Sequence, residues 1–220
     1  MDATAAARRE AECIHRAAVA AGNDPWNLLD FVKREAVRRE LDVYALPPGD
    51  PQLKGGRAAL DSQAGIILYE EAGSEFDRAF LIAHELGHVT LEGGTQDVVT
   101  EQVEPDRSVE DAPVGIEKVL DYGARERREI RMDLFARELL LPRSVARHLH
   151  VTDGLSSEDI AKRLGAPLQV VQQQLLDALL LPVEEAATDP IRVSAAALTP
   201  DPTQIAAVVH RNSPFQLQAG

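Results

Sequence analysis

Residues 80–88 read Phe-Leu-Ile-Ala-His-Glu-Leu-Gly-His, and this stretch decides the fold that the chain is expected to adopt. Its apolar residues recur at the spacing of a helix that packs one face against a core. Ser74 and Asp77, three residues apart, form the capping-box pattern that opens such a helix. His84 and His88 would then lie one above the other, because positions i and i+4 are neighbours on a helix surface.

The two histidines and the glutamate beside them predict a metal site. Imidazoles four residues apart on a helix can reach one metal ion, and this spacing is typical of Zn²⁺. Glu85 is rotated by about 100° from His84, so it lies where it can take a proton from a bound water. An accidental histidine pair on a core helix is the competing interpretation. The capped, amphipathic helix favours the zinc site, with His84 and His88 as ligands and Glu85 as catalytic base.

A catalytic zinc ion needs a third protein ligand beside an open position. The strongest candidates are Glu129 and Asp133, again four residues apart, on a helix expected over residues 125–141. One carboxylate would bind the metal, and the other would accept a hydrogen bond from a ligand imidazole. Glu126, one turn earlier, is a competing ligand, and such acidic pairs usually lie on a solvated helix face. Tyr122 and the arginines near it are candidates for stabilising an oxyanion.

These residues resemble the ImmA/IrrE family of zinc peptidases, within the thermolysin-like gluzincin group. Three stretches carry the resemblance: residues 66–69, 80–88 and 129–142. It implies that Glu129 is the third zinc ligand, that Asp133 orients an imidazole and that Glu85 is the base. The similarity covers about residues 25–150, and Met132 departs from the alanine that is usual in the family.

Members of that family cleave repressors or other regulatory proteins in the bacterial cytosol. The resemblance therefore implies a zinc-dependent endopeptidase that cleaves a specific intracellular protein, with a protein substrate as its partner. A second departure from the family pattern is the long acidic stretch of residues 92–124. Within it, residues 92–112 hold seven acidic side chains against one arginine. We expect residues 92–112 to form a mobile acidic loop.

The chain as a whole predicts an α+β protein, a mostly helical zincin-like peptidase domain with a small β-sheet, followed by a helix-turn-helix-like appendix. Asp24 and Pro25 are expected to open the second helix, which would run to Glu40. Helices are expected over residues 3–21, 25–40, 75–93, 125–141, 143–150, 157–165 and 167–181, and strands over residues 41–46, 58–61 and 65–69. Four segments are expected: an N-terminal helix (1–24), the peptidase domain (25–150), the appendix (151–182), and a linker with a truncated helicase-like start (183–220).

The appendix is the part of the sequence that could touch DNA. Residues 157–175 are similar to a helix-turn-helix, in which Gly165 would make the turn. Residues 153–181, however, hold four acidic and two basic side chains, whereas a DNA-binding module is basic. A packing or protein-contact role is therefore favoured over nucleic-acid binding.

The C-terminal end resembles the start of a UvrD-like superfamily 1 helicase. Gln204 is similar to the glutamine that contacts adenine there, and residues 215–218 are similar to the strand before the phosphate-binding loop. No G-x-x-x-x-G-K-[ST] motif follows, so we expect no ATP binding. The resemblance implies the N-terminal part of a longer helicase-fused protein of a DNA-damage or defence response, with the helicase region as an attached partner.

The composition of the chain disfavours some binding partners and cellular locations. The formal net charge of −13 over 220 residues disfavours contact with nucleic acid or anionic membranes. No apolar run approaches the about 18 residues of a membrane span, and no signal peptide is recognisable, so a cytoplasmic location is expected. Cys13, the single cysteine, is expected to be a buried thiol. Two rival functions stay open: an inactive zinc-binding sensor or scaffold that regulates the attached helicase, and a DNA-binding regulator.

Overall fold

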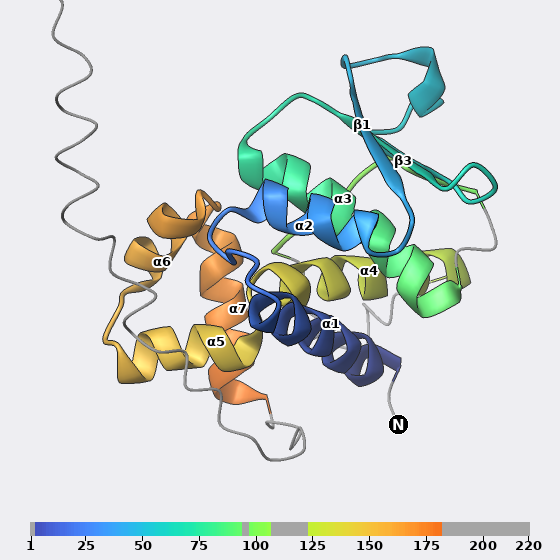
Figure 1. The fold of residues 1–220 in the computed structure, drawn as a ribbon. Coiled ribbons are helices and arrows are strands. Elements are labelled where there is room, and N and C mark those ends of the chain that lie inside the picture. The colour runs from blue at the N-terminus through green and yellow to red at the C-terminus, as the bar shows by residue number, and fades with distance from the viewer. Residues whose placement is uncertain (1–2, 94–96, 107–122, 182–220) are drawn as a thin grey trace, which may run out of the picture. The chain divides into compact units, whose positions relative to one another are not determined.

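The computed structural model describes residues 3–93, 97–106 and 123–181. Within these ranges the chain is an α+β protein, so the predicted fold class is confirmed at this level (Figure 1). The helices are α1 (Ala3–Ala20), α2 (Leu28–Val37), α3 (Glu75–Glu92), α4 (Ala124–Leu140), α5 (Arg143–Arg147), α6 (Ser157–Leu164) and α7 (Leu168–Leu180). A 3₁₀ turn at Pro51–Leu53 and a π-helical turn at His148–Thr152 complete the helical elements.

A four-stranded mixed sheet has the order β1-β3-β2-β4. Its strands are β1 (Asp42–Leu46), β2 (Ala58–Asp61), β3 (Ile66–Glu70) and β4 (Val98–Thr100). β1 runs parallel to β3, and β2 is antiparallel to both β3 and β4. β2 and β3 form the predicted pair of strands joined by a tight turn, in which the Asp61 carboxylate accepts hydrogen bonds from the Gln63 and Ala64 amides.

β4 corrects the prediction of a loop over residues 92–112. Val98 and Thr100 are buried, and β4 pairs with β2 along its length. Asp97 is exposed, but it is tied to the β2–β3 turn, because its carboxylate accepts hydrogen bonds from the backbone amide and the hydroxyl of Ser62. Pairing with a sheet edge that lies far away in the sequence outweighed the acidic composition of the segment. Residues 94–96 and 107–112 of the predicted loop lie outside the described residues.

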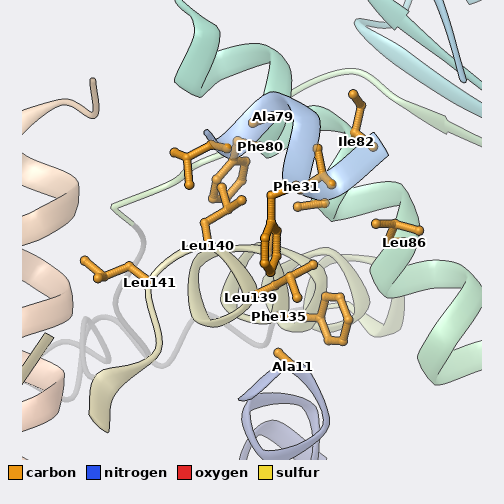
Figure 2. Close-up of a cluster of buried hydrophobic side chains, with 14 of the residues drawn as sticks. Ala11, Phe31, Ala79, Phe80, Ile82, Leu86, Phe135, Leu139, Leu140 and Leu141 are labelled. Carbon is orange, nitrogen blue, oxygen red and sulfur yellow. The ribbon is translucent and has the colours of Figure 1, made fainter. Parts of the chain in front are cut away.

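α3 is the central helix of the fold. It packs against β2 and β3 on one side and against α4 and α2 on the others, and α1 lies along α4 (Figure 1). The capping box predicted at its start is present, since Ser74 and Asp77 exchange side-chain and backbone hydrogen bonds. Figure 2 shows the Phe31 ring pointing from α2 toward α4, in a buried cluster that includes Phe80 and Leu139. This core fixes α3 and α4 against each other.

Glycine at position 87 permits the close crossing of α3 and α4. A Cβ atom placed there would lie 3.0 Å from the Met132 sulfur and 3.1 Å from Cδ1 of Phe135. Both of these side chains are fully buried. The side chains of Met132 and Phe135 therefore fill the space above Gly87.

Two local predictions are wrong. The second helix begins at Leu28, because the Asn27 side chain caps it by accepting from the Asp30 amide. Asp24 instead closes the preceding turn by accepting from the Trp26 amide. Cys13 is exposed, not buried, because it lies on the solvent side of α1.

The C-terminal helices belong to the same compact unit, which extends to residue 184. The predicted turn between α6 and α7 is confirmed, with Gly165 in the left-handed conformation at a φ of 63°. α7 turns Gln174 and Asp177 inward, and Asp177 pairs with Arg137 of α4 and Arg8 of α1.

The segment boundaries predicted at residues 24 and 150 both lie inside the first compact unit of the chain. The predicted linker and helicase-like start fall almost wholly outside the described residues. In the described ranges, no helix is both long enough and apolar enough to cross a membrane.

Candidate metal centre

Two crossing helices bring three predicted ligands together. His84 and His88 come from α3 and Glu129 comes from α4, and one donor atom of each lies within 4.8 Å of the other two. Both imidazoles are buried, whereas Glu129 is partly exposed. Glu126, the competing ligand, is exposed and lies outside this cluster. The helix register therefore places Glu129, and not Glu126, beside the two histidines.

Asp133 supports the first of these imidazoles. Nδ1 of His84 lies 2.9 Å from Oδ1 of Asp133, and Nε2 lies 3.2 Å from Oε2 of Glu129. Burial by itself lowers the pKa of His84, but the hydrogen bonds to these two carboxylates outweigh it and raise the pKa to about 9. Without a metal, His84 is thus an imidazolium that donates to both acids. The other Asp133 oxygen accepts from the Glu104 amide at 3.3 Å.

Glu129 titrates as the partner of these imidazoles. Burial raises its pKa, but the hydrogen bond with His84 and the charge interactions with His84 and His88 outweigh burial and hold the pKa well below its ordinary value. Its Oε2 lies 3.8 Å from Nε2 of His88. Glu129 is therefore a carboxylate at neutral pH, which is the form that binds a metal ion.

Glu85 lies wholly buried beside the cluster. Burial raises the pKa of its carboxyl group above the ordinary value. The Thr100 hydroxyl donates to its Oε1 at 2.7 Å. Among the described residues, Oε2 of Glu85 and Nε2 of His88 are buried side-chain atoms without a hydrogen-bond partner.

Thr100 is a functional candidate that the sequence prediction missed. β4 carries it to the site, because Ala58 of β2 pairs with Thr100 and the Arg57 amide donates to the Thr100 carbonyl at 2.7 Å. Gly56 allows this approach, since a Cβ there would lie 2.7 Å from the same carbonyl oxygen. The residue was hidden within the predicted acidic loop, and no local pattern marks it.

Glu92 and Arg128 are the other two residues that sequence reasoning missed. Oε2 of Glu92 lies 3.0 Å from Nδ1 of His88, and the guanidinium of Arg128 donates to both Glu92 oxygens. Burial raises the pKa of Glu92, but the hydrogen bonds with Arg128 and His88 outweigh it and lower the pKa. The four-residue spacing between His88 and Glu92 could have revealed this contact, had Glu92 not been assigned to the loop.

The structure describes some of the residues that were proposed to stabilise an oxyanion, namely arginines near Tyr122, but not the tyrosine itself. Tyr122 lies outside the described residues. Arg125 is exposed and pairs with Glu101 at 3.3 Å. Arg128 donates to both carboxylate oxygens of Glu92.

The donor set fits a divalent metal ion such as zinc. Two imidazole nitrogens and one carboxylate are the ligands of a known class of catalytic zinc sites. A buried imidazole nitrogen without a partner costs free energy, and coordination would remove that cost for Nε2 of His88. Oε2 of Glu85, the residue next to His84 in α3, is likewise buried and without a hydrogen-bond partner among the described residues.

Neither protein-family models nor curated proteins provide a match to this chain. The resemblance to ImmA/IrrE peptidases therefore rests on the sequence motifs of residues 66–69, 80–88 and 129–142 alone.

Proposed function

We propose that this chain is a zinc-dependent endopeptidase of the ImmA/IrrE type, with a zincin-like fold, that cleaves a specific intracellular protein such as a repressor. One observation carries the proposal. Two crossing helices, α3 and α4, bring His84, His88 and Glu129 within reach of one ion, next to the buried carboxylate of Glu85. The packing of α3, which carries His84 and His88, against a small mixed sheet supports the proposal of a zincin-like fold.

His84, His88 and Glu129 would hold the metal. When bound, zinc would polarise the scissile carbonyl and make a neighbouring water more acidic. The chain's own residues do the remaining chemistry. Glu85 accepts the water proton on Oε2, since Oε1 is held by Thr100, and returns it to the leaving amine.

Asp133 would orient His84. A carboxylate at Nδ1 holds that nitrogen protonated and leaves the Nε2 lone pair for the metal. The Glu104 amide holds the second oxygen of Asp133, so the carboxylate has a fixed direction. The substrate is a proposal from the resemblance alone, because no described surface selects a particular protein.

The decisive experiment compares wild type with Glu85→Gln. Both proteins should purify with one equivalent of zinc, because Glu85 lies outside the ligand set. When each is induced in cells, one protein should be shortened by the wild type only, since loss of a general base costs roughly 10²–10⁴-fold in rate. Mass spectrometry of new protein termini provides the measurement.

Glu126→Gln is the matched control, because Glu126 is an exposed acid on α4 outside the cluster. It should cleave like the wild type. Zinc binding without any new terminus would favour the rival inactive sensor, and a purified wild type that takes up no zinc would overturn the metal site itself.

A further inference from the structure

The two metal-binding histidines are supported in different ways. His84 has Asp133 behind it, deep in the core. His88 has Glu92 behind it, one turn further along α3, with Oε2 at 3.0 Å from Nδ1. The Glu92 side chain is 24% exposed, compared with 3% for Asp133. The carboxylate behind His88 therefore needs something other than burial to fix its position.

Arg128 supplies that support from the neighbouring helix. Its Nε lies 2.7 Å from Oε1 and 2.8 Å from Oε2 of Glu92, so one guanidinium holds both carboxylate oxygens. This two-point contact sets the direction of the carboxylate as well as its distance. Arg128 directly precedes Glu129 in α4. The same turn of α4 thus contributes a metal ligand and the anchor for the support of another ligand.

We propose that Glu92 and Arg128 are positioning residues of the metal centre. Glu92 keeps the proton of His88 on Nδ1, so that Nε2 faces the metal with its lone pair, and Arg128 keeps Glu92 in place. This inference rests on the proposed metal site. Glu92 and Arg128 thus have a role in metal binding, beyond the ion pair that they form between α3 and α4.

The physical argument concerns the tautomer of His88. A neutral imidazole carries one N–H, and the group that binds one nitrogen decides where the proton resides. Nε2 of His88 is buried and, in the described part of the chain, lacks a hydrogen-bond partner. If the proton moved to Nε2, an N–H group would point at the metal position and coordination would be blocked. A fixed acceptor at Nδ1 prevents this.

Zinc affinity tests the proposal without any substrate. Competition with a chelator should show zinc binding about 10–100-fold weaker in Glu92→Ala, as is usual when the support of a ligand is removed. Glu92→Gln should lie between Ala and wild type, because its amide oxygen still accepts a hydrogen bond from Nδ1–H of His88. Arg128→Gln should weaken zinc binding less than Glu92→Ala does. The double variant Glu92→Ala/Arg128→Gln should bind zinc about as well as Glu92→Ala alone, because Arg128 acts only through Glu92.

The matched controls are Glu101→Gln and Arg125→Gln, which remove an exposed ion pair at the start of α4. Their zinc affinity should equal that of the wild type. Wild-type affinity in Glu92→Ala would overturn the inference and leave the proposed peptidase intact. A wild type that binds no zinc would instead overturn the proposed function.

NMR of the cobalt(II)-substituted protein distinguishes a role of Glu92 in positioning His88 from a role in stabilising the fold. Its NMR spectrum should contain two strongly shifted exchangeable signals, one from the Nδ1–H of each metal-bound imidazole. Glu92→Ala should speed solvent exchange of one signal and leave the other unchanged, and Glu92→Gln should restore part of the protection. A purely structural role predicts lower thermal stability with both signals equally protected, and that result would also overturn the inference.

Discussion

Thr100 shows how one hydroxyl can set the direction of a buried carboxylate. The Glu85 carboxylate is buried, and Thr100 is its hydrogen-bond donor on Oε1, at 2.7 Å. The oxygen left over, Oε2, is the one available to a proton. Thr100 at the sheet edge therefore holds Glu85, while α3, the helix that carries Glu85, contributes the two proposed histidine ligands. This division means that the metal and the base can be perturbed separately.

Thr100→Val should lower cleavage and leave zinc content unchanged. Valine has nearly the same shape but cannot donate, so Oε1 becomes a buried acceptor without a partner at a cost of about 1–3 kcal/mol. Thr100→Ser should restore most of the activity. Rates on the substrate found in cells, together with zinc analysis, measure both effects. Equal rates for valine and serine would show that the hydroxyl has no part in the reaction.

His84 should release a proton when zinc binds. Its pKa in the metal-free protein is raised from 6.5 to about 9, so at pH 7.5 it is protonated and must lose that proton to coordinate. Apparent zinc affinity should therefore rise with pH until about 9, and the proton released should decline above that pH. Titration calorimetry in buffers of different ionisation enthalpy measures the release.

The same shift has a consequence for stability. A raised pKa means that the folded state holds the proton more tightly, so this contribution is complete below pH 6.5 and is lost as pH rises through about 9. Asp133→Asn removes the strongest of the interactions that raise the pKa, and should move proton release to lower pH. If the pH dependence of proton release is unchanged in this variant, Asp133 is not the cause of the raised pKa of His84.

At the scale of elements, the crossing of α3 and α4 decides whether the ligands meet. The histidines and Glu129 come from different helices, so the spacing of the helices sets the size of the metal site. Gly87 lies at the crossing, against Met132 and Phe135. A small residue at this point allows the two backbones to approach closely.

Gly87→Ala should weaken both the fold and zinc binding. Crowding of a packed core typically costs about 1–3 kcal/mol, and it opposes the gain of up to about 1 kcal/mol from replacing glycine in a helix. We expect crowding to dominate, because both neighbours are fully buried. Chemical denaturation and chelator competition give the two readouts. Gly123→Ala is the control, since a Cβ there meets nothing within 4 Å; equal behaviour of the two variants would contradict the crowding argument.

At the scale of the whole molecule, a buried polar network joins the C-terminal helices to the metal-site helix. Arg137, one turn after Asp133 in α4, donates to Asp177 and Gln174 of α7 and to the Pro105 carbonyl. α7 is therefore part of the support of α4, although its sequence resembles a detachable helix-turn-helix. α7 also contains no lysine or arginine, whereas DNA contact would need basic residues.

Removing residues 185–220 should leave zinc content and thermal stability nearly unchanged, because the first compact unit ends at residue 184. Cutting after Gly165 should be strongly destabilising, since it removes the buried apolar face of α7 and also breaks the buried pairs of Asp177 with Arg137 and Arg8. Breaking a buried pair in this way typically costs about 3–5 kcal/mol. Thermal denaturation and metal analysis compare the two cuts. Collapse after the first cut would place the tail within the fold.

The sequence by itself determined the helices and the first part of the site. Capping boxes at Ser74 and Ser156 and the glycine after α6 are local signals, and the structure follows them. The pairing of His84 with His88 is equally local, because a helix places residues four apart on one face. Where competing caps stood close together, as at Asp24 and Asn27, sequence reasoning chose the wrong one.

Only the tertiary structure decided which other residues complete the site. Thr100 is 15 residues from Glu85, Arg128 is 36 from Glu92, and Asp177 is 40 from Arg137. No pattern of local spacing joins such partners. They meet because β4 pairs with β2 and because α3, α4 and α7 bury a common core. The free energy that places them comes from burial and pairing across the whole fold, which a short window of sequence does not contain.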